Sequence, residues 1–287
     1  MAMNNSWRTI KYDKIKNYKS KKFRRITGVR REIFEKMIKI LVLAKAKLQR
    51  KGGPESTLSI EDMLLVALEY WREYRTYAHI AASFGVHEST IFRIVRWVED
   101  VLIKSGAFSL PGKKVLRYSA ESGIEIILID ATESPIERPK RGQSKYYSGR
   151  KKRHTMKTIV IVEKATQRII CLVFANGKRH DFRVFKESGI NIDEAIKVLT
   201  DTGFIGIKKL HANSEHPRKK EKKKKLSKED KIFNKKVSRE RVVNENVIGF
   251  VKRFRILSDR YRNRRKRFGL RFNLIAGICN LDIANSV

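Results

Sequence analysis

The feature that most restricts the fold is an apolar run that leads directly into a carboxylate. Residues Ile124 to Ile129, IEIILI, are rich in β-branched side chains and predict a buried strand, and Asp130 follows at once. An unpaired charge beside a buried strand is costly unless a partner or a metal ion compensates it. Two interpretations therefore stay open for this stretch alone: Asp130 marks a turn, as aspartate often does after a strand, or it binds a metal.

The same pattern occurs again downstream. Lys197 to Thr200 is a short apolar strand that runs into Asp201 and a glycine-containing turn. Before it, Thr155 to Val162 and Arg168 to Phe174 predict two strands, and the short turn between them indicates an antiparallel meander. The second half of the chain is therefore expected to contain a sheet.

Helical segments complete this half of the chain. One runs from Asp181 to about Ile196, and a long one near the C-terminus contains Glu245. The order strand, strand, strand, helix, strand, helix predicts a ribonuclease-H-like mixed sheet, with Asp130 and Asp201 at neighbouring strand ends and Glu245 delivered by the helix. Carboxylate oxygens suit two hard cations roughly 3.5–4 Å apart, which is the arrangement that cleaves phosphodiesters.

The first third of the chain is helical in pattern. The segment RREIFEKMIKILVLAKAKLQ has a broad apolar face, and Gly52, Gly53 and Pro54 interrupt it. Ser59 is placed to cap the next helix, MLLVALEYWREY. These elements predict an all-α N-terminal domain.

The segment TYAHIAASFGVHESTIFRIVRWVEDVL has the pattern of a helix-turn-helix. Gly85 supplies the left-handed turn, and the following helix buries Ile91, Ile94 and Val95. An ordinary helical hairpin is the alternative. If the second helix enters the major groove, the side chains nearest to DNA are His87, Ser89, Thr90, Arg93 and Arg96.

The charge favours a nucleic-acid partner. Lys and Arg number 66 against 30 Asp and Glu, a formal net charge of +36, while 41% of the residues are apolar, as expected for a folded chain. A DNA-binding protein and a DNA-processing enzyme fit this charge equally well. Cys171 and Cys279 lie in apolar segments without a C-x-x-C pair, and no signal peptide or membrane span is evident. We expect a cytoplasmic, nucleoid-associated protein.

Four blocks together resemble the insertion-sequence transposases of the DDE superfamily, in the large branch that includes insertion sequence five. Three of them are DATESPIERPKRGQSKYYSGRKKRHTMKT around Asp130, GKRHDFRVFKES, and LTDTGFIGI around Asp201. The fourth follows the spacing Tyr, two residues, Arg, three residues, Glu, six residues, Lys. Arg241, Glu245 and Lys252 match it, whereas Ser238 stands at the tyrosine position. The resemblance covers nearly the whole chain.

The resemblance implies a transposase that cuts double-stranded DNA at element ends and joins the freed 3′-hydroxyl to target DNA, with a homodimer as the active complex. Asp130, Asp201 and Glu245 would bind two Mg²⁺ ions, for which Mn²⁺ can substitute. Arg241 and Lys252 would hold DNA phosphates. Two alternatives remain: a decayed or domesticated relative that only binds DNA, and a nuclease of the same fold that cleaves without joining strands.

Some of these residues have a simpler explanation. Arg241 and Glu245 are also spaced as a solvated i,i+4 ion pair. His180 and Asp181 could form another metal pair, in which His180 supports a metal ligand, but Asp181 is equally a helix cap. The segment 138–154 is either a solvated basic loop or a surface that binds phosphates and stacks tyrosines on bases. Its candidate residues are Lys140, Arg141, Lys145, Tyr146, Tyr147, Arg150, Lys151, Lys152 and Arg153.

The expected architecture is therefore α+β (α/β), in three parts. Residues 1–22 form a basic arm, and residues 23–112 form a helical DNA-binding domain with a helix-turn-helix at about 76–97. Residues 120–287 form a ribonuclease-H-like DDE catalytic domain. This last domain is expected to carry a Lys-rich insertion at about 215–231.

Overall fold

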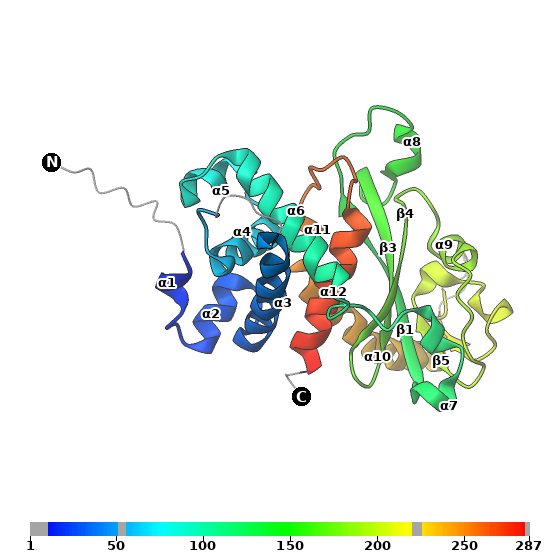
Figure 1. Cartoon of the computed structure of the whole chain (residues 1–287). Helices are drawn as coiled ribbons and strands as arrows, with labels where there is room; N and C mark the ends of the chain where they lie inside the picture. The colour runs from blue at the N-terminus through cyan, green and yellow to red at the C-terminus, as the bar shows by residue number, and fades with distance from the viewer. Residues whose placement is uncertain (1–10, 51–55, 220–225, 285–287) are drawn as a thin grey trace. The chain divides into compact units, whose positions relative to one another are not determined.

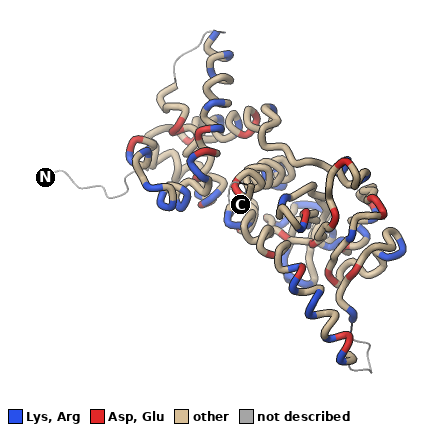
Figure 2. The backbone as a smooth tube through the Cα atoms, turned by 90° about the horizontal axis from the view of Figure 1, so that it is seen from below, with Lys and Arg blue, Asp and Glu red and all other residues tan. Residues whose placement is uncertain are grey.

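The computed structural model describes residues 11–50, 56–219 and 226–284 (Figure 1). Its contacts divide the chain into two units. The helical unit comprises residues up to 109 together with 253–259 and 270–282, and the sheet unit comprises residues 110–252 and 260–269 with the last few residues. Both units carry many Lys and Arg residues (Figure 2).

Within the described residues, the first part of the chain contributes six helices to the helical unit. They are α1 (Tyr12–Ile15), α2 (Ser20–Thr27), α3 (Arg31–Gln49), α4 (Ile60–Arg72), α5 (Tyr77–Phe84) and α6 (Glu88–Lys104). The apolar face predicted for α3 is buried at Ile33, Phe34, Met37 and Leu41. The predicted break at 52–54 lies outside the described residues.

The cap predicted for α4 is confirmed, because the Ser59 hydroxyl accepts a hydrogen bond from the Asp62 amide at 3.1 Å. The amide of Tyr12 donates to the Asp62 carboxylate at 2.8 Å, and Ile15 is fully buried. The helical unit therefore begins inside the segment 1–22 that was expected to be an arm. A single apolar residue, Ile15, within a run of lysines was too weak a signal to predict this.

The helix-turn-helix prediction is confirmed. Gly85 caps the end of α5 with a left-handed φ of 68°, and α6 begins at Glu88 after Val86 and His87. Ile91, Ile94 and Val95 face the interior, as expected.

Two segments from the end of the chain complete the helical unit. Helix α11 (Arg255–Ser258) packs against α4, and most of α12 (Phe268–Ala284) belongs to this unit. The sequence had suggested that residues 120–287 form one catalytic domain. The division differs because α12 is mostly apolar and its buried Arg271 pairs with Glu99 in the first hundred residues.

The sheet unit is built on a mixed sheet. Its strands are β1 (Ile126–Pro135), β2 (Tyr147–Ser148), β3 (Arg153–Glu163), β4 (Ile169–Asn176), β5 (Lys197–Thr200) and β6 (Ser214–Glu215). The main order is β4-β3-β1-β5-β6, and β2 pairs with the start of β3. Strand β3 is antiparallel to both β1 and β4, whereas β5 is parallel to β1 and to β6. This is the strand arrangement of the expected ribonuclease-H-like core, and the α+β class is confirmed.

Helices cover both faces of the sheet (Figure 1). On one face, alternate residues of β1, β3 and β5 form an apolar cluster with α9 (Asp181–Glu187), through Val184 and Phe185. Helix α10 (Lys228–Lys252) packs against β1, β3 and β5. Its buried residues Val237, Val247 and Val251 are not part of that cluster, so α10 covers the other face.

This unit also contains the short α-helices α7 (Ser119–Ser122) and α8 (Gln143–Tyr146). The helix expected from Asp181 to about Ile196 ends at Glu187, since Gly189 turns the backbone to a φ of 61°. The Lys-rich insertion expected at 215–231 is shorter, because α10 begins at Lys228 and the Arg218 guanidinium pairs with Asp230. Residues 220–225 of that insertion lie outside the described residues.

No helix in the described ranges is long and apolar enough to span a membrane.

Candidate active site

The sheet brings Asp130 and Asp201 to the same place. The parallel pairing of β1 with β5 ends at Ile129 opposite Thr200. Asp130 and Asp201 are the next residues after this pair, so the two aspartates lie side by side at the end of the paired region. Alternation along the strands puts Asp130 on the face of Leu128, which is the face that α10 covers. The sequence suggested that the first strand ends before Asp130, but β1 does not stop there. It continues to Pro135 through its pairing with β3, so the carboxylate lies where one neighbouring strand ends and the other goes on.

Helix α10 brings Arg241 and Glu245 toward this point. The Arg241 guanidinium lies 3.9 Å from a carboxylate oxygen of Asp130, and both side chains are mostly buried. Glu245, one turn further, is exposed, and its charge acts on Asp130. The buried stripe of the helix contains Asn244 and Val247, so Glu245 is not a core position.

The charge of Asp130 is held in an unfavourable setting. Burial is the main cause that raises its pKa, to about 6, and the nearby carboxylates of Asp201 and Glu245 raise it further. The Ala131 amide and Arg241 act in the opposite direction. Two carboxylates thus act against the charge of Asp130 at one end of the β1–β5 pair, and the nearby Arg241 does not offset this.

A divalent cation fits this donor set chemically, since hard cations prefer carboxylate oxygens and would relieve the repulsion. Within the described ranges, however, no three His, Cys, Asp or Glu side chains are close enough together to hold a metal ion. The three carboxylates therefore interact electrostatically without forming a ready-made coordination shell.

A fourth carboxylate, Asp181, lies beside Asp201. The sequence suggested it equally as a member of a metal pair with His180 and as a helix cap. A Cβ atom placed on Gly203 would be 2.8 Å from an Asp181 oxygen and 2.9 Å from an Asp201 oxygen. The Gly203 amide also donates to Asp201 at 2.8 Å. Glycine is thus required between the two carboxylates. His180, proposed to support a ligand, is the N-cap residue of α9 and is exposed, so Asp181 rather than His180 approaches the site.

Lys157 is a residue of this region that the sequence did not single out. It lies on β3 opposite Glu133 and is only 7% exposed. Its ammonium group is 2.5 Å from the Asp181 carboxylate and donates to the Arg179 carbonyl at 2.5 Å. A buried lysine thus holds Asp181 in place. The sequence could not predict that Lys157 is buried, because that depends on which face of the sheet the helices cover.

Two further residues within the fourth block have structural contacts. The Lys252 ammonium donates to the backbone carbonyl of Glu133 at 2.8 Å, which ties the end of α10 to β1, and burial lowers its pKa. Glu240 pairs with Lys164 at 2.7 Å, and this hydrogen bond lowers the Glu240 pKa. Glu240 is therefore engaged away from Asp130, whereas Glu245 is electrostatically coupled to it.

The candidate DNA-reading residues lie on the accessible side of α6. His87, Ser89, Arg93 and Arg96 are exposed, and Thr90 is half-buried. The His87 ring accepts from the Ser89 amide and so caps the helix. An exposed aromatic residue, Phe92, lies beneath Arg96 and was not predicted as a contact.

The basic segment 138–154 contains α8 and β2 and is mostly exposed. Lys140, Arg141, Lys145, Arg150, Lys151, Lys152 and Arg153 all reach solvent. Tyr147 is 44% exposed and available for stacking, whereas Tyr146 is half-buried beneath the Arg265 guanidinium, 4.6 Å from its ring centre. Of the two tyrosines, Tyr147 is the better candidate to contact a base.

Two family models match this chain. The model described as DDE superfamily endonuclease matches residues 129–280, which include all three candidate ligands, and the helix-turn-helix of DDE superfamily endonuclease matches residues 56–108.

The chain belongs to the DDE superfamily of endonucleases.

Two curated relatives agree with this assignment. A probable transposase for insertion sequence element IS702 of Microchaete diplosiphon is 47% identical over 96% of this DDE superfamily chain and 99% of its own length. A putative transposase for insertion sequence element IS112 of Streptomyces albus G is 28% identical over 63% of the chain and 65% of its own length. No solved structure matches the chain.

Proposed function

We propose that this DDE superfamily chain is an insertion-sequence transposase that cleaves double-stranded DNA at element ends and transfers the 3′-ends to target DNA. The observation that carries the proposal is the meeting of Asp130 and Asp201 at the end of the β1–β5 pair, with Glu245 coupled to Asp130 from α10. The full-length similarity to a probable transposase supports the same conclusion.

Asp130, Asp201 and Glu245 are the residues that would hold two Mg²⁺ ions, with Mn²⁺ as a substitute. When bound, such ions activate the attacking oxygen and stabilise the leaving 3′-oxygen. Arg241, beside Asp130, positions that carboxylate, and Lys157 positions Asp181 behind Asp201. Lys252 fixes the end of α10 to β1, so its role is positioning rather than the phosphate contact expected from the sequence.

Exposed cations on α6 and in segment 138–154 would bind the duplex, and α6 would read bases through Arg93 or Arg96. We further propose that two copies of the chain act together, one on each element end.

Replacing Glu245 with glutamine tests the proposed active site. Glu245→Gln keeps size and helix propensity but removes the charge, so nicking of bound element-end DNA in Mg²⁺ should be lost while DNA affinity is retained. Glu240→Gln is the matched control, since Glu240 pairs with Lys164 on the same helix. An active Glu245→Gln with an inactive Glu240→Gln would reject the assignment of the third ligand.

The same assay separates the alternative functions. Nicking that persists in excess chelator contradicts the metal requirement. Cleavage without joining of a pre-cut 3′-hydroxyl end to target DNA identifies a nuclease that does not transpose, and binding without cleavage identifies a decayed relative. Sedimentation of the chain with and without paired element ends tests the dimer.

A further inference from the structure

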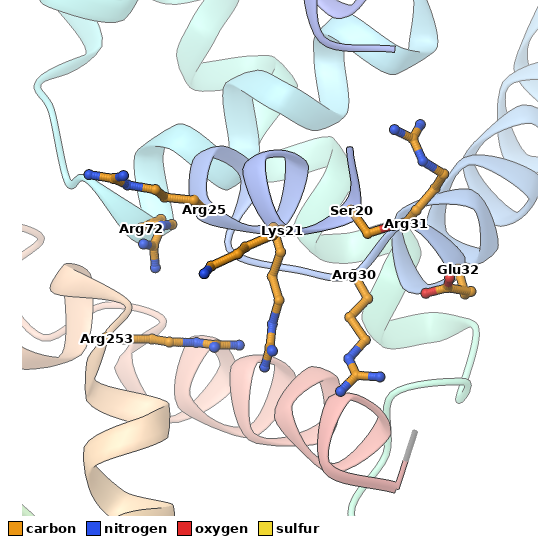
Figure 3. Close-up of a pocket in the computed structure, with 9 residues that line it drawn as sticks. Ser20, Lys21, Arg25, Arg30, Arg31, Glu32, Arg72 and Arg253 are labelled. Atoms are coloured by element: carbon orange, nitrogen blue, oxygen red, sulfur yellow. The ribbon is translucent and has the colours of Figure 1, made fainter. Parts of the chain in front are cut away.

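The helical unit contains a strongly basic pocket that is separate from the reading face of α6. Its volume is about 710 Å³, and seven of its nine lining residues are Lys or Arg, contributed by α2, the start of α3, the end of α4 and Arg253 (Figure 3). The resemblance that identified the active site assigned no role to any of these residues.

One buried carboxylate organises part of the pocket. Asp282 is fully buried, and its oxygens lie 2.9 Å from Arg24, 3.0 Å from Arg30 and 2.7 Å from Arg253. Figure 3 shows Arg30 and Arg253 on opposite sides of the pocket. A single carboxylate that contacts three guanidinium groups holds them in fixed positions but balances only one of their charges.

Four more cations line the pocket without sharing Asp282, namely Lys21, Arg25, Arg31 and Arg72. Lys21 and Arg25 are exposed on α2, and the Arg72 side chain at the end of α4 is 20% exposed. Burial is the main cause that lowers the Arg72 pKa, and the charges of Arg253 and Arg255 add to it. The only acidic residue among those lining the pocket is Glu32, which is exposed at its edge.

The excess positive charge indicates an anionic ligand. Guanidinium groups match phosphate oxygens in geometry and are weakly hydrated, so arginine is the usual residue for phosphate recognition. A phosphodiester brings one negative charge at a time, and a run of them along a duplex can neutralise several cations spread over one surface. The lining residues come from four separate segments, which suits a continuous backbone better than one small ion.

We propose that this pocket is a second DNA-binding site of the helical unit, at which phosphodiester groups of duplex DNA contact Lys21, Arg25 and Arg72. The proposal rests on the proposed function and extends it: backbone affinity is provided here, while α6 supplies sequence discrimination. Contacts to phosphates carry no sequence information, so the site serves element ends and target DNA alike.

The test compares two triple variants of the full chain. Lys21→Gln/Arg25→Gln/Arg72→Gln removes three pocket cations and leaves the Asp282 contacts intact. Lys39→Gln/Lys45→Gln/Lys47→Gln removes three cations from α3 and changes the net charge equally. Binding is measured in chelator, against salt, to a mixed-sequence duplex without element ends. Because each phosphate contact contributes about 0.9 to the log–log salt slope, the pocket variant should lose up to about 2.7 of it. The control should lose little.

The proposal is overturned if both variants lose slope equally, which indicates net charge alone, or if the pocket variant keeps the wild-type slope. Inorganic phosphate, assayed by thermal shift, separates a free-anion site from a DNA site. If phosphate stabilises the wild type but not the pocket variant, while both bind duplex DNA equally, the pocket binds a free anion. That result would reject the DNA contact.

Folding is checked by circular dichroism. If the triple variant unfolds, the single exposed substitution Arg25→Gln replaces it, with Lys39→Gln as its control, and the slope should fall by about 0.9. None of these measurements depends on cleavage, so a failed nicking assay leaves this result interpretable, and the reverse also holds.

Discussion

The Asp130 side chain is 17% exposed and has two acidic neighbours, so its charge opposes folding when no cation is bound. Its pKa is raised from 3.8 to about 6 in the folded chain. Between these values the folded chain keeps a proton that the unfolded chain has lost. The free energy of unfolding therefore falls as pH rises through this window, by about 2–3 kcal/mol at most.

Asp130→Asn should remove this loss of stability at higher pH, because asparagine carries no charge. In chelator above pH 7, the variant is expected to be more stable than the wild type by about 1–3 kcal/mol, and the difference should fade as pH approaches 4. Urea unfolding at several pH values measures it. Mg²⁺ should stabilise the wild type but not the variant, and a stability difference that does not change with pH would refute the explanation.

Single residues were predictable where one segment contains the whole signal. Asp130 and Asp201 each follow a run of apolar residues, so the local sequence singled out both as candidates. The helical spacing of Arg241 and Glu245 fits a solvated ion pair equally well, and only the block spacing with the two preceding aspartates favoured the active site. Lys157 and Asp181 were not identified as a pair because their contact joins β3 to α9. A lysine on a strand is ordinarily solvated, and its burial depends on which elements cover the sheet.

At the scale of elements, α6 combines an exposed reading face with a buried ion pair. The buried Glu99 carboxylate accepts from the Trp71 indole at 3.1 Å and from Arg271 of α12 at 2.6 Å. It thereby joins α4, α6 and α12. Sequence periodicity predicted the apolar residues of α6 but could not show that Glu99 faces the core with a partner 172 residues away.

Arg271→Met should destabilise the chain by about 3–5 kcal/mol, because it leaves the Glu99 charge buried without its cation. The double variant Glu99→Leu/Arg271→Met removes both charges and should regain much of that loss. Urea unfolding of both single variants and the double variant gives the coupling. If the destabilisation of the double variant equals the sum of the two single variants, the Glu99–Arg271 ion pair has no coupling energy and the prediction fails.

The exposed face of α6 gives a second prediction at this scale. Replacing Arg93 and Arg96 with alanine should weaken binding to element ends, since both side chains reach solvent beside the N-terminus of the reading helix. If either contacts a base edge, discrimination against a random duplex should fall by about 1–3 kcal/mol. Affinity measured on both DNAs distinguishes this from phosphate contacts, which would weaken both equally. Unchanged binding to element ends would exclude this helix from the interface.

At the scale of the whole molecule, the helical unit is discontinuous in sequence. Residues 253–259 and 270–282 return to it after the sheet unit, and Asp282 and Arg271 supply buried partners for Arg24, Arg30 and Glu99. The sequence alone suggested two consecutive domains, because composition and periodicity change near residue 112. The returning helix is mostly apolar, and an apolar pattern does not show which core the helix joins.

A fragment of residues 1–112 should therefore not fold stably, although it contains the complete helix-turn-helix. It lacks the carboxylate of Asp282, the cation of Arg271 and the apolar residues of α12. Circular dichroism melts of the fragment, alone and with a peptide of residues 253–284, measure this. Cooperative melting should appear only when the peptide is added. A cooperative transition for the fragment alone would show that residues 1–112 fold without the C-terminal segments and would contradict the prediction.

The discontinuous unit has a consequence for the order of events during protein synthesis. Domains ordinarily fold as they leave the ribosome, starting from the N-terminus. Here the helix-turn-helix emerges early, but residues 270–282 of its unit are made after every candidate metal ligand. If the fragment fails to fold as predicted, we expect nascent and prematurely terminated chains to lack a complete helical unit, so that only chains that already contain the candidate metal ligands bind an element end.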